Sequence, residues 1–427
     1  MQESQRRTRV AITGLGVISS IGNSAEAVVE SLRLGRSGVE LFDEFKLPEI
    51  PVKLAGTIKG FSFPSTHFED WKLPPDYSLT REQMRSMTPN SIYGYCAMRQ
   101  AIEDAALTED QISSPRTSIM TAAGASMWLT YDNLHTMVTR GIQRCQPLSI
   151  VNSIPGALYI NLGAIFKIHG GALGFSSACS SSAHALGDAY DQIAFGRQDR
   201  AFVVGAEDCN KYTFLPFAAV RALSQQTDPA KAPCAFDKKR DGFVGTGGAA
   251  VLLLEAWDVA QARGAKIYAE LAGWGQSSDG YNVLAPDPTG EGLSRCMNLA
   301  MQNAGIQPDE VDAINAHATS TPVGDVAELR AIKASFLGKK PWVSSTKSLT
   351  GHALSAAGAL EALISCLSIH QGIIPLSANV TEPDSEADGV PIPHETLSTQ
   401  PRIILSNSSG FGGTNVSLVF RAPTTAQ

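Results

Sequence analysis

Short, continuously apolar segments alternate with helical segments along this chain, and this alternation constrains the fold more than any other feature. Each apolar segment is too short for a buried helix and is rich in Val, Ile, Leu and Ala, as buried strands are. Strands of this kind that alternate with helices are typical of α/β folds built on mostly parallel sheets. We therefore expect an α/β fold with strands over residues 9–18, 116–123, 201–206 and 249–255 and helices over residues 25–34 and 91–106.

The second part of the chain repeats the rhythm of the first. Residues 266–275 (KIYAELAGWG) resemble residues 9–16 (RVAITGLG), because each has a basic residue, an apolar strand and then glycines. Such repetition indicates an internal duplication, and no linker separates the copies. We therefore predict two fused halves, residues 1–264 and 265–427. The further elements expected in the second half are a helix over 291–304, a strand over 311–316 and a helix from residue 326.

The composition argues against several classes of function. A formal net charge of −7 over 427 residues disfavours non-specific nucleic-acid binding, which needs clustered Lys and Arg. The seven cysteines include no CxxC pair, so they fit neither a zinc motif nor a small disulfide scaffold and favour a reducing compartment. The N-terminus has no apolar core like that of a signal peptide, and no run approaches the roughly 20 apolar residues of a spanning helix. We expect a cytoplasmic protein without membrane insertion and without a nucleic-acid partner.

Cys179 is the strongest candidate nucleophile. Residues 174–185 read GFSSACSSSAHA, and the helical spacing that follows places Cys179 at a strand-to-helix turn. The free N–H groups and the dipole of a helix N-terminus favour a thiolate, and small neighbours leave room for an acyl group. The same pattern also fits a buried structural cysteine, because free cysteines are commonly buried.

Two histidines and a lysine stand in segments of small and hydroxylated residues. His317 follows an expected strand in INAHATSTPVGD, and His352 precedes a helix in TKSLTGHALSAAGALEA, which also holds Lys347 and Glu361. Ends of strands and starts of helices are where catalytic groups concentrate. Together with a cysteine, two imidazoles can activate a thiol, polarise a thioester carbonyl or hold an enolate oxygen. For both His317 and His352, the alternative is an ordinary buried histidine without a catalytic role.

A glycine-rich segment precedes the last strand. Residues 403–415 read IILSNSSGFGGTN, and we expect Gly410, Gly412 and Gly413 to adopt positive φ and to let a ligand approach the backbone. A phosphate-binding loop is one interpretation, but no Lys follows the glycines and no helix starts there. An oxyanion hole built from backbone N–H groups fits better.

Taken together, the motifs resemble those of the β-ketoacyl-acyl-carrier-protein synthases of the decarboxylating Cys-His-His class. The similarity covers essentially the whole chain, through ITGLGVISSIG, SSACSSSAH, RDGFVGTGG, HATSTPVGD, TKSLTGH with AAGALEA, and SNSSGFGGTN. It implies a thiolase-like fold, in which two similar α/β halves pack as a five-layered αβαβα body, and a homodimer. It further implies an acyltransferase of fatty-acid or polyketide-type chain elongation, whose partner is acyl carrier protein. No cofactor is expected, since phosphopantetheine arrives on the carrier protein.

The resemblance also implies roles for individual residues. Cys179 would hold the acyl group, His317 and His352 would promote decarboxylation and stabilise the enolate, and Lys347 would set the charge around them. The remaining residues implied by the motifs are Glu361 in support, the N–H groups of Cys179 and Phe411 as the oxyanion hole, and Thr319, Thr321, Phe243, Ser409, Gly412 and Gly413 around the substrate and its pantetheine arm.

Two positions depart from the family pattern. Ala318 replaces a glycine after the first active-site histidine, and Ser409 replaces a phenylalanine two residues before Phe411. Because aromatic residues at this place usually gate the acyl pocket, we hypothesise a looser gate and a wider or unusual acyl substrate.

Other family readings fit less well. A thiolase would need a second catalytic cysteine near the C-terminal glycines, and none follows Cys366. An initiating synthase would carry Asn in place of His352, and a chain-length-factor-like subunit would lack the nucleophile. The spacing of the three residues suggests no metal motif, so no metal is expected. Arg140 and Arg144 are candidates for docking the acidic carrier protein near the tunnel mouth, with ordinary surface charge as the alternative.

Overall fold

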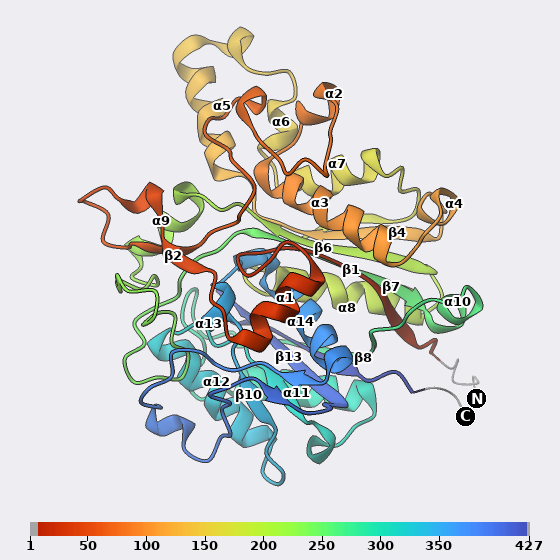
Figure 1. Ribbon diagram of the computed structural model, residues 1–427, viewed down its shortest axis with the longest axis vertical. Helices are drawn as coiled ribbons and strands as arrows, with labels where there is room; N and C mark the ends of the chain where they lie inside the picture. Colours follow the sequence, from red (N-terminus) through yellow and green to blue (C-terminus); the bar gives the residue numbers. More distant parts are fainter. Residues whose placement is uncertain (1–6, 425–427) are drawn as a thin grey trace.

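A single ladder of strands runs through the molecule. The computed structural model describes residues 7–424, and in this range ten strands pair in the order β10-β9-β13-β14-β8-β1-β7-β6-β4-β5 (Figure 1). Its strands are β1 Val10–Ile18, β4 Thr117–Ala122, β5 Ala172–Phe175, β6 Arg200–Glu207, β7 Gly248–Ala256, β8 Ala269–Ser278, β9 Ala313–Asn315, β10 Trp342–Ser344, β13 Ile403–Gly410 and β14 Thr414–Arg421. Two small ladders join β2 Val39–Leu41 to β3 Leu54–Gly56 and β11 Ile373–Ile374 to β12 Leu397–Ser398.

Helices cover and separate the strands. The α-helices are α1 Ala25–Leu34, α2 Arg81–Met84, α3 Pro89–Asp104, α4 Glu109–Ile112, α5 Met127–Arg140, α6 Ser149–Asn152, α7 Ala157–Ile165, α8 Ser181–Ala194, α9 Lys211–Ala219, α10 Trp257–Ala262, α11 Glu291–Ala304, α12 Pro322–Ser335, α13 Lys347–Thr350 and α14 Ala357–Gln371. Short 3-10 turns are η1 Asp43–Phe45, η2 Phe68–Asp70, η3 Ile142–Arg144, η4 Pro308–Glu310, η5 Leu354–Ala356 and η6 Ser385–Ala387.

Most elements expected from the sequence are confirmed. The helices over 25–34 and 291–304 have those bounds, and the helix predicted over 91–106 begins and ends two residues earlier, at Pro89–Asp104. The first helix ends where Gly35 adopts a left-handed conformation with φ 61°. The helix predicted from residue 326 begins earlier, at Pro322, because proline is well accommodated in the first turn of a helix.

The expectation of mostly parallel strands is wrong. Of the nine pairings in the large ladder, four are parallel and five are antiparallel. The reason is that some connections begin and end at the same end of the ladder, which makes the next strand antiparallel. Strand β7, for example, starts with Gly248 paired to Glu207, the last residue of β6. Alternation of strands and helices does not reveal whether a connection crosses the sheet, so it cannot fix strand direction.

The order of strands is symmetric about its centre. Reading outward from β1 gives β7, β6, β4 and β5, and reading outward from β8 gives β14, β13, β9 and β10. On each side the inner two pairings are antiparallel and the outer two are parallel. The division at residue 264 stays a prediction, and this repeated order supports it, since β7 precedes and β8 follows that residue.

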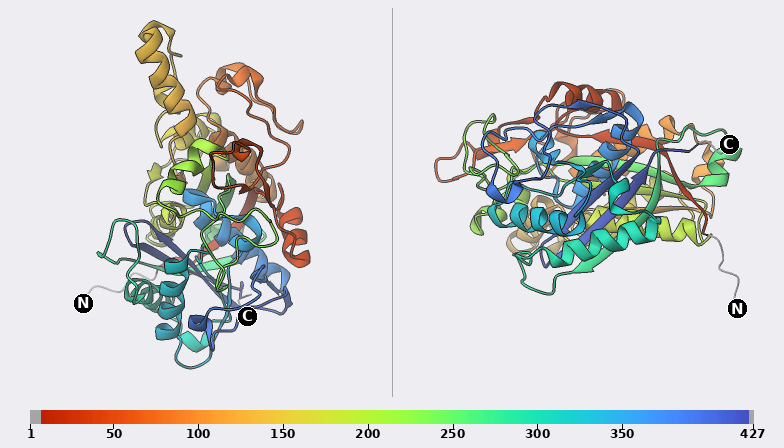
Figure 2. Two further views of the ribbon diagram at one scale, coloured as in Figure 1. Left: turned by 90° about the vertical axis from the view of Figure 1, so that its left-hand side faces the viewer. Right: turned by 90° about the horizontal axis from the view of Figure 1, so that it is seen from below.

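Two helices lie between the halves of the ladder. Helix α8 contacts β4, β5 and β6 on one side and β8 and β14 on the other, and α14 likewise contacts β6, β7, β13 and β14. Helices α3 and α11 cover the outer faces, as Figure 1 and the two views of Figure 2 show. The layers therefore run helix, sheet, helix, sheet, helix, which is the expected thiolase-like architecture.

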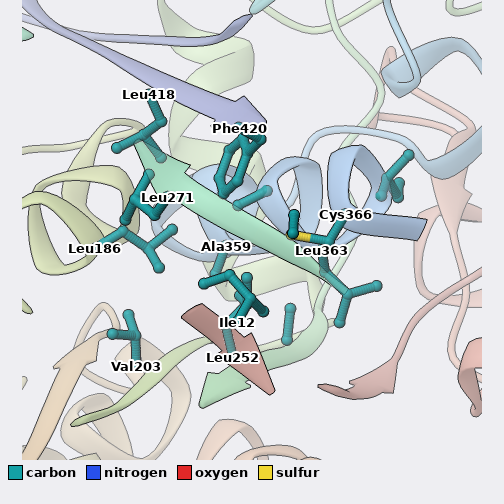
Figure 3. Close-up of a cluster of buried hydrophobic side chains, with 14 of the residues drawn as sticks. Ile12, Leu186, Val203, Leu252, Leu271, Ala359, Leu363, Cys366, Leu418 and Phe420 are labelled. Atoms are coloured by element: carbon teal, nitrogen blue, oxygen red, sulfur yellow. The ribbon is translucent and has the colours of Figure 1, made fainter. Parts of the chain in front are cut away.

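The largest hydrophobic core surrounds this middle layer. Figure 3 shows side chains from both halves of the ladder meeting those of α8 and α14: Ile12, Leu252, Val203, Leu271, Leu418, Phe420, Leu186, Ala359, Leu363 and Cys366. Each large apolar side chain buried here contributes roughly 1.5–3 kcal/mol. Close packing of the two helices requires Gly358, where a Cβ atom would lie 2.7 Å from the backbone nitrogen of Ala183. The middle layer is thus a rigid base for the residues at its ends.

Within residues 7–424, no helix combines the length and apolarity that crossing a bilayer requires. The seven cysteines are all free.

Candidate active site

Cys179 lies in a tight turn between the end of β5 and the start of α8. Ala178 adopts φ 52°, a left-handed conformation that costs energy for a residue with a Cβ atom. Hydroxyl groups hold the turn: Ser181 Oγ donates to the carbonyl of Ala178 (2.6 Å), and Ser180 Oγ donates to the carbonyl of Ser177 (2.8 Å). The turn aims Cys179 into a cavity, while its side chain is 8 % exposed.

The thiol of Cys179 is protonated in this resting state. Burial raises the pKa of Cys179 to about 12, although the positive charge of Lys347 acts in the opposite direction. The helix N-terminus favours a thiolate, as the sequence indicates, but burial of the thiol acts in the opposite direction.

Two imidazoles adjoin the thiol. The Sγ atom of Cys179 and one ring nitrogen from each of His317 and His352 lie within 4.8 Å of one another. The two rings meet edge to face, with centroids 5.3 Å apart and planes at 85°. Burial is the main cause that lowers the pKa of both histidines well below the usual value, and Lys347 lowers both further. Both rings are therefore neutral at neutral pH and can accept or donate a proton.

The backbone at each histidine is fixed from a different direction. Glu328 accepts hydrogen bonds from the backbone N–H groups of His317 (2.9 Å) and Ala318 (2.6 Å). His352 donates its backbone N–H to the carbonyl of Val244 (2.7 Å), next to strand β7. The backbones of the two histidines are therefore held by two separate sets of hydrogen bonds.

Lys347 and Glu361 form a buried ion pair behind His317. Lys347 begins α13, Glu361 lies on α14, and both are 2 % exposed. Burial raises the pKa of Glu361 to about 7, against the effect of Lys347. Lys347 Nζ also lies 3.4 Å from His317 Nδ1. Because an ammonium group can only donate, Nδ1 is the acceptor and the ring proton of neutral His317 resides on Nε2.

The glycine-rich segment forms a hairpin turn beside Cys179. Gly412 and Gly413 adopt φ 83° and 72°, as expected, but the expectation of positive φ for Gly410 is wrong, since it ends strand β13. Gly410 is needed instead for close approach, because a Cβ atom there would lie 2.6 Å from the carbonyl oxygen of Ser177. Across residues 7–424, no protein acceptor receives the backbone N–H of Cys179 or of Phe411. Both remain available to a substrate oxygen.

A cavity of about 410 Å³ connects these groups. Cys179, His317 and His352 line its inner end, where a row of aromatic rings begins: Phe243 packs edge-on against His352, Phe217 against Phe243, and Phe411 against Phe217. The other residues predicted from the sequence that line it are Thr319, Thr321 and Ser409. Gly412 and Gly413 do not line it, and Lys347 and Glu361 lie behind His317.

Several lining residues were missed by the sequence analysis. Phe217 and Glu328 lie in ordinary helical segments, and nothing in their spacing distinguishes them. The loop before α11, helix α11 and helix α12 also line the cavity, through Leu284, Ala285, Pro286, Leu293 and Ala327. Arg221, an exposed residue with φ 55°, also lines the cavity and provides a positive charge there.

Ser409 lines the same cavity. Its Oγ donates to Oδ1 of Asn415 (2.8 Å), and Nδ2 of Asn415 donates to Asp279 (2.7 Å). The small side chain is thereby held against the hairpin, and it leaves the space beside it open.

Arg140 and Arg144 do not reach the Cys179 cavity within this chain. Arg140 ends α5, which projects from the body (Figure 1), and Arg144 lies in η3. With Arg85 and His67 they line a separate cavity of about 570 Å³. Their predicted place near the tunnel mouth is therefore wrong for a single chain.

The chain matches two family models. Residues 7–260 match the N-terminal domain of β-ketoacyl synthases, and residues 268–381 match the C-terminal domain. The 3-oxoacyl-[acyl-carrier-protein] synthase 1 of Haemophilus influenzae is 42 % identical over 97 % of this chain and 98 % of its own length.

Solved structures of the same kind superpose on the whole fold. A β-ketoacyl synthase from Burkholderia phymatum has a TM-score of 0.89 at 32 % identity and covers 98 % of this chain and 100 % of its own. A type II polyketide ketosynthase, solved in complex with its acyl-carrier protein and bound to the hexaketide, has a TM-score of 0.86 at 27 % identity, with the same coverage.

Proposed function

The chain belongs to the β-ketoacyl synthase family, and on that premise we propose that it joins an acyl group held on Cys179 to the carbanion of malonyl-acyl-carrier protein. It is an acyltransferase of the 3-oxoacyl-acyl-carrier-protein synthase type. The observation that carries the residue assignments is the meeting of one thiol and two neutral imidazoles at the end of one cavity.

In the first half-reaction, an acyl group moves from pantetheine to Cys179. The sulfur of Cys179 bonds to the acyl carbon, the carbon–sulfur bond to pantetheine breaks, and the thiol proton ends on the released pantetheine sulfur. The neutral imidazole of His352 relays that proton, since Nε2 of His317 already carries one. The free N–H groups of Cys179 and Phe411 hold the oxygen of the tetrahedral intermediate.

In the second half-reaction, the malonyl thioester loses carbon dioxide. The electrons of the broken carbon–carbon bond become an enolate, whose oxygen receives hydrogen bonds from His317 Nε2 and from His352. The enolate carbon then bonds to the acyl carbon, the bond from that carbon to Cys179 breaks, and the departing sulfur takes up a proton from solvent to restore the thiol. Lys347 supports this step because its contact with Nδ1 fixes the donor tautomer of His317, and Glu361 holds Lys347 in place.

The carrier protein delivers both substrates on a phosphopantetheine arm, so we assign the enzyme no cofactor of its own. Thr319 and Thr321, whose hydroxyls are 3.1 Å apart, offer hydrogen bonds to the arm, and Phe243 forms an apolar wall. Ser409 adjoins the acyl chain, and Gly412 and Gly413 shape the hairpin that presents Phe411. Arg221 suits the acidic carrier better than Arg140 and Arg144 do, since it lines the Cys179 cavity and those two line a separate one.

We further assign a homodimer and a cytoplasmic location. Strand β5 ends the ladder, and the residues 172–174 are exposed, so its outer edge is open to pairing. Helix α5 also carries exposed apolar side chains that a partner subunit could cover: Met127, Tyr131, Leu134 and Val138. The free cysteines agree with a reducing cytoplasm.

A reconstituted condensation assay tests the proposal. Purified enzyme with acyl- and malonyl-acyl-carrier protein should release carbon dioxide and form a 3-oxoacyl product. His317→Ala and His352→Ala should each stop decarboxylation, while Cys179 of His317→Ala still becomes acylated. If both variants decarboxylate malonyl-acyl-carrier protein at the parent rate, the histidine roles proposed here are wrong.

A further inference from the structure

The three side chains at the end of the cavity are also a complete set of zinc ligands. Thiolate sulfur and neutral imidazole nitrogen are the donors that Zn²⁺ prefers, and three protein ligands with one open position are common in catalytic zinc sites. The spacing of these residues along the chain suggests no metal motif. Folding nevertheless brings Cys179 Sγ and one nitrogen each of His317 and His352 within 4.8 Å of one another.

The cluster is close to the geometry that zinc requires. Bonds of about 2.3 Å to sulfur and about 2.0–2.1 Å to nitrogen put tetrahedral ligand atoms roughly 3.5 Å apart. The widest pair here must close by roughly 1 Å, which small side-chain rotations achieve. A binding metal would release the thiol proton of Cys179 to solvent. The fourth position would face the cavity.

One neighbour opposes metal binding. A metal-bound histidine normally gives its second N–H to a carboxylate or a carbonyl oxygen. Behind His317 the structure has an ammonium group instead, since Lys347 Nζ lies 3.4 Å from Nδ1. With Nδ1 as the acceptor, Nε2 carries the ring proton and has no lone pair for a metal. The charge of Lys347 also repels a divalent cation.

We propose that Lys347 keeps Zn²⁺ out of the Cys179–His317–His352 cluster, which is otherwise a latent zinc site. Lys347 cannot turn toward solvent, because it is 2 % exposed and paired with Glu361. Its placement therefore lets a thiol and two imidazoles stay together without being captured by a thiophilic cation. This role of Lys347 is separate from its role in the proposed condensation. It depends only on the geometry of Lys347 and the three side chains of the cluster.

Titration of the full-length enzyme with ZnCl2 tests the inference. Lys347→Met removes the charge and keeps the length of the side chain, so isothermal calorimetry should show one Zn²⁺ per chain, bound at least about tenfold more tightly than by the parent. Co²⁺ should give the absorption band of a thiolate–cobalt bond in the same variant. Both signals should disappear when Cys179→Ala is added.

Two further variants make the outcome decisive. Lys347→Met with Glu361→Gln removes the whole ion pair and avoids leaving a buried carboxylate without a partner, so it serves if the single variant does not fold. Lys339→Met removes an exposed lysine paired with Asp312 and should leave the Zn²⁺ affinity unchanged. Equal Zn²⁺ affinity in the parent and in a folded variant without Lys347, or no binding by either, would overturn the inference. The readout is metal binding, so it is independent of whether the proposed condensation is correct.

Discussion

Filling the space beside Ser409 should shorten the range of acyl chains that the enzyme accepts. Ser409→Phe places an aromatic ring in the cavity that Leu284, Leu293 and Ala327 also line. The Ser409 hydroxyl is held by Asn415, so the present side chain does not move further into the cavity. A ring at this position displaces the part of the substrate that would occupy it.

The size of the effect follows from apolar burial. Each methylene moved from the cavity to water costs about 0.8 kcal/mol, so a ring that excludes two methylenes costs about 1.6 kcal/mol and lowers kcat/KM about 15-fold for chains long enough to reach it. Short chains keep their rate. Ser409→Phe also removes the hydrogen bond to Asn415, which is worth about 1 kcal/mol.

Competition among a series of saturated acyl-carrier-protein substrates measures this change. Ser409→Ala is the matched control, because it loses the same hydrogen bond without adding a ring. We expect the control to retain the parent profile and Ser409→Phe to lose its longest substrates. An unchanged profile in Ser409→Phe would show that the acyl chain does not pass this residue.

Three further results are expected. Arg221→Glu should raise KM for carrier-bound substrate and spare a free pantetheine thioester in steady-state assays; equal effects on both substrates would remove Arg221 from docking. Burial raises the pKa of Glu207 to about 7, above its unfolded value near 4.5, so the folded protein keeps a proton that the unfolded chain has lost and stability falls as pH rises through this interval. Glu207→Gln should therefore gain stability relative to the parent between pH 5 and pH 8, by up to about 3 kcal/mol in denaturant titrations, and a constant difference would refute the assignment. Leu363→Ala, in the fully buried middle layer, should cost about 2–5 kcal/mol in the same titrations, and a loss below 1 kcal/mol would contradict the packing described.

The sequence predicted the parts of this protein that depend on local patterns. Apolar runs placed the strands, and the small residues around Cys179 correctly predicted a strand-to-helix turn. The family motifs nominated His317 and His352, which folding brings next to the thiol. Strand direction was predicted wrongly, because the return of β7 to the edge where β6 ends is decided by a long connection rather than by either strand.

Properties that arise only from burial escaped prediction. A helix N-terminus favours a thiolate, yet the pKa of Cys179 is raised, since the surrounding apolar groups exclude water. The contact of Lys347 with His317, which fixes the ring tautomer, joins segments whose spacing carries no signal. The sequence spacing of Glu328 likewise gives no sign that it accepts a hydrogen bond from the backbone N–H of His317.

Intact-protein mass spectrometry of the enzyme with a panel of acyl-acyl-carrier-protein thioesters tests the central claim most directly. Cys179→Ala, measured in parallel, removes the thiol and little else. We predict a mass increase of one acyl group on the parent chain, strongest for certain chain lengths, and none on the variant. An acyl adduct that persists in Cys179→Ala, or no adduct from any thioester on the parent, would contradict the assignment of Cys179 as the acyl-accepting nucleophile.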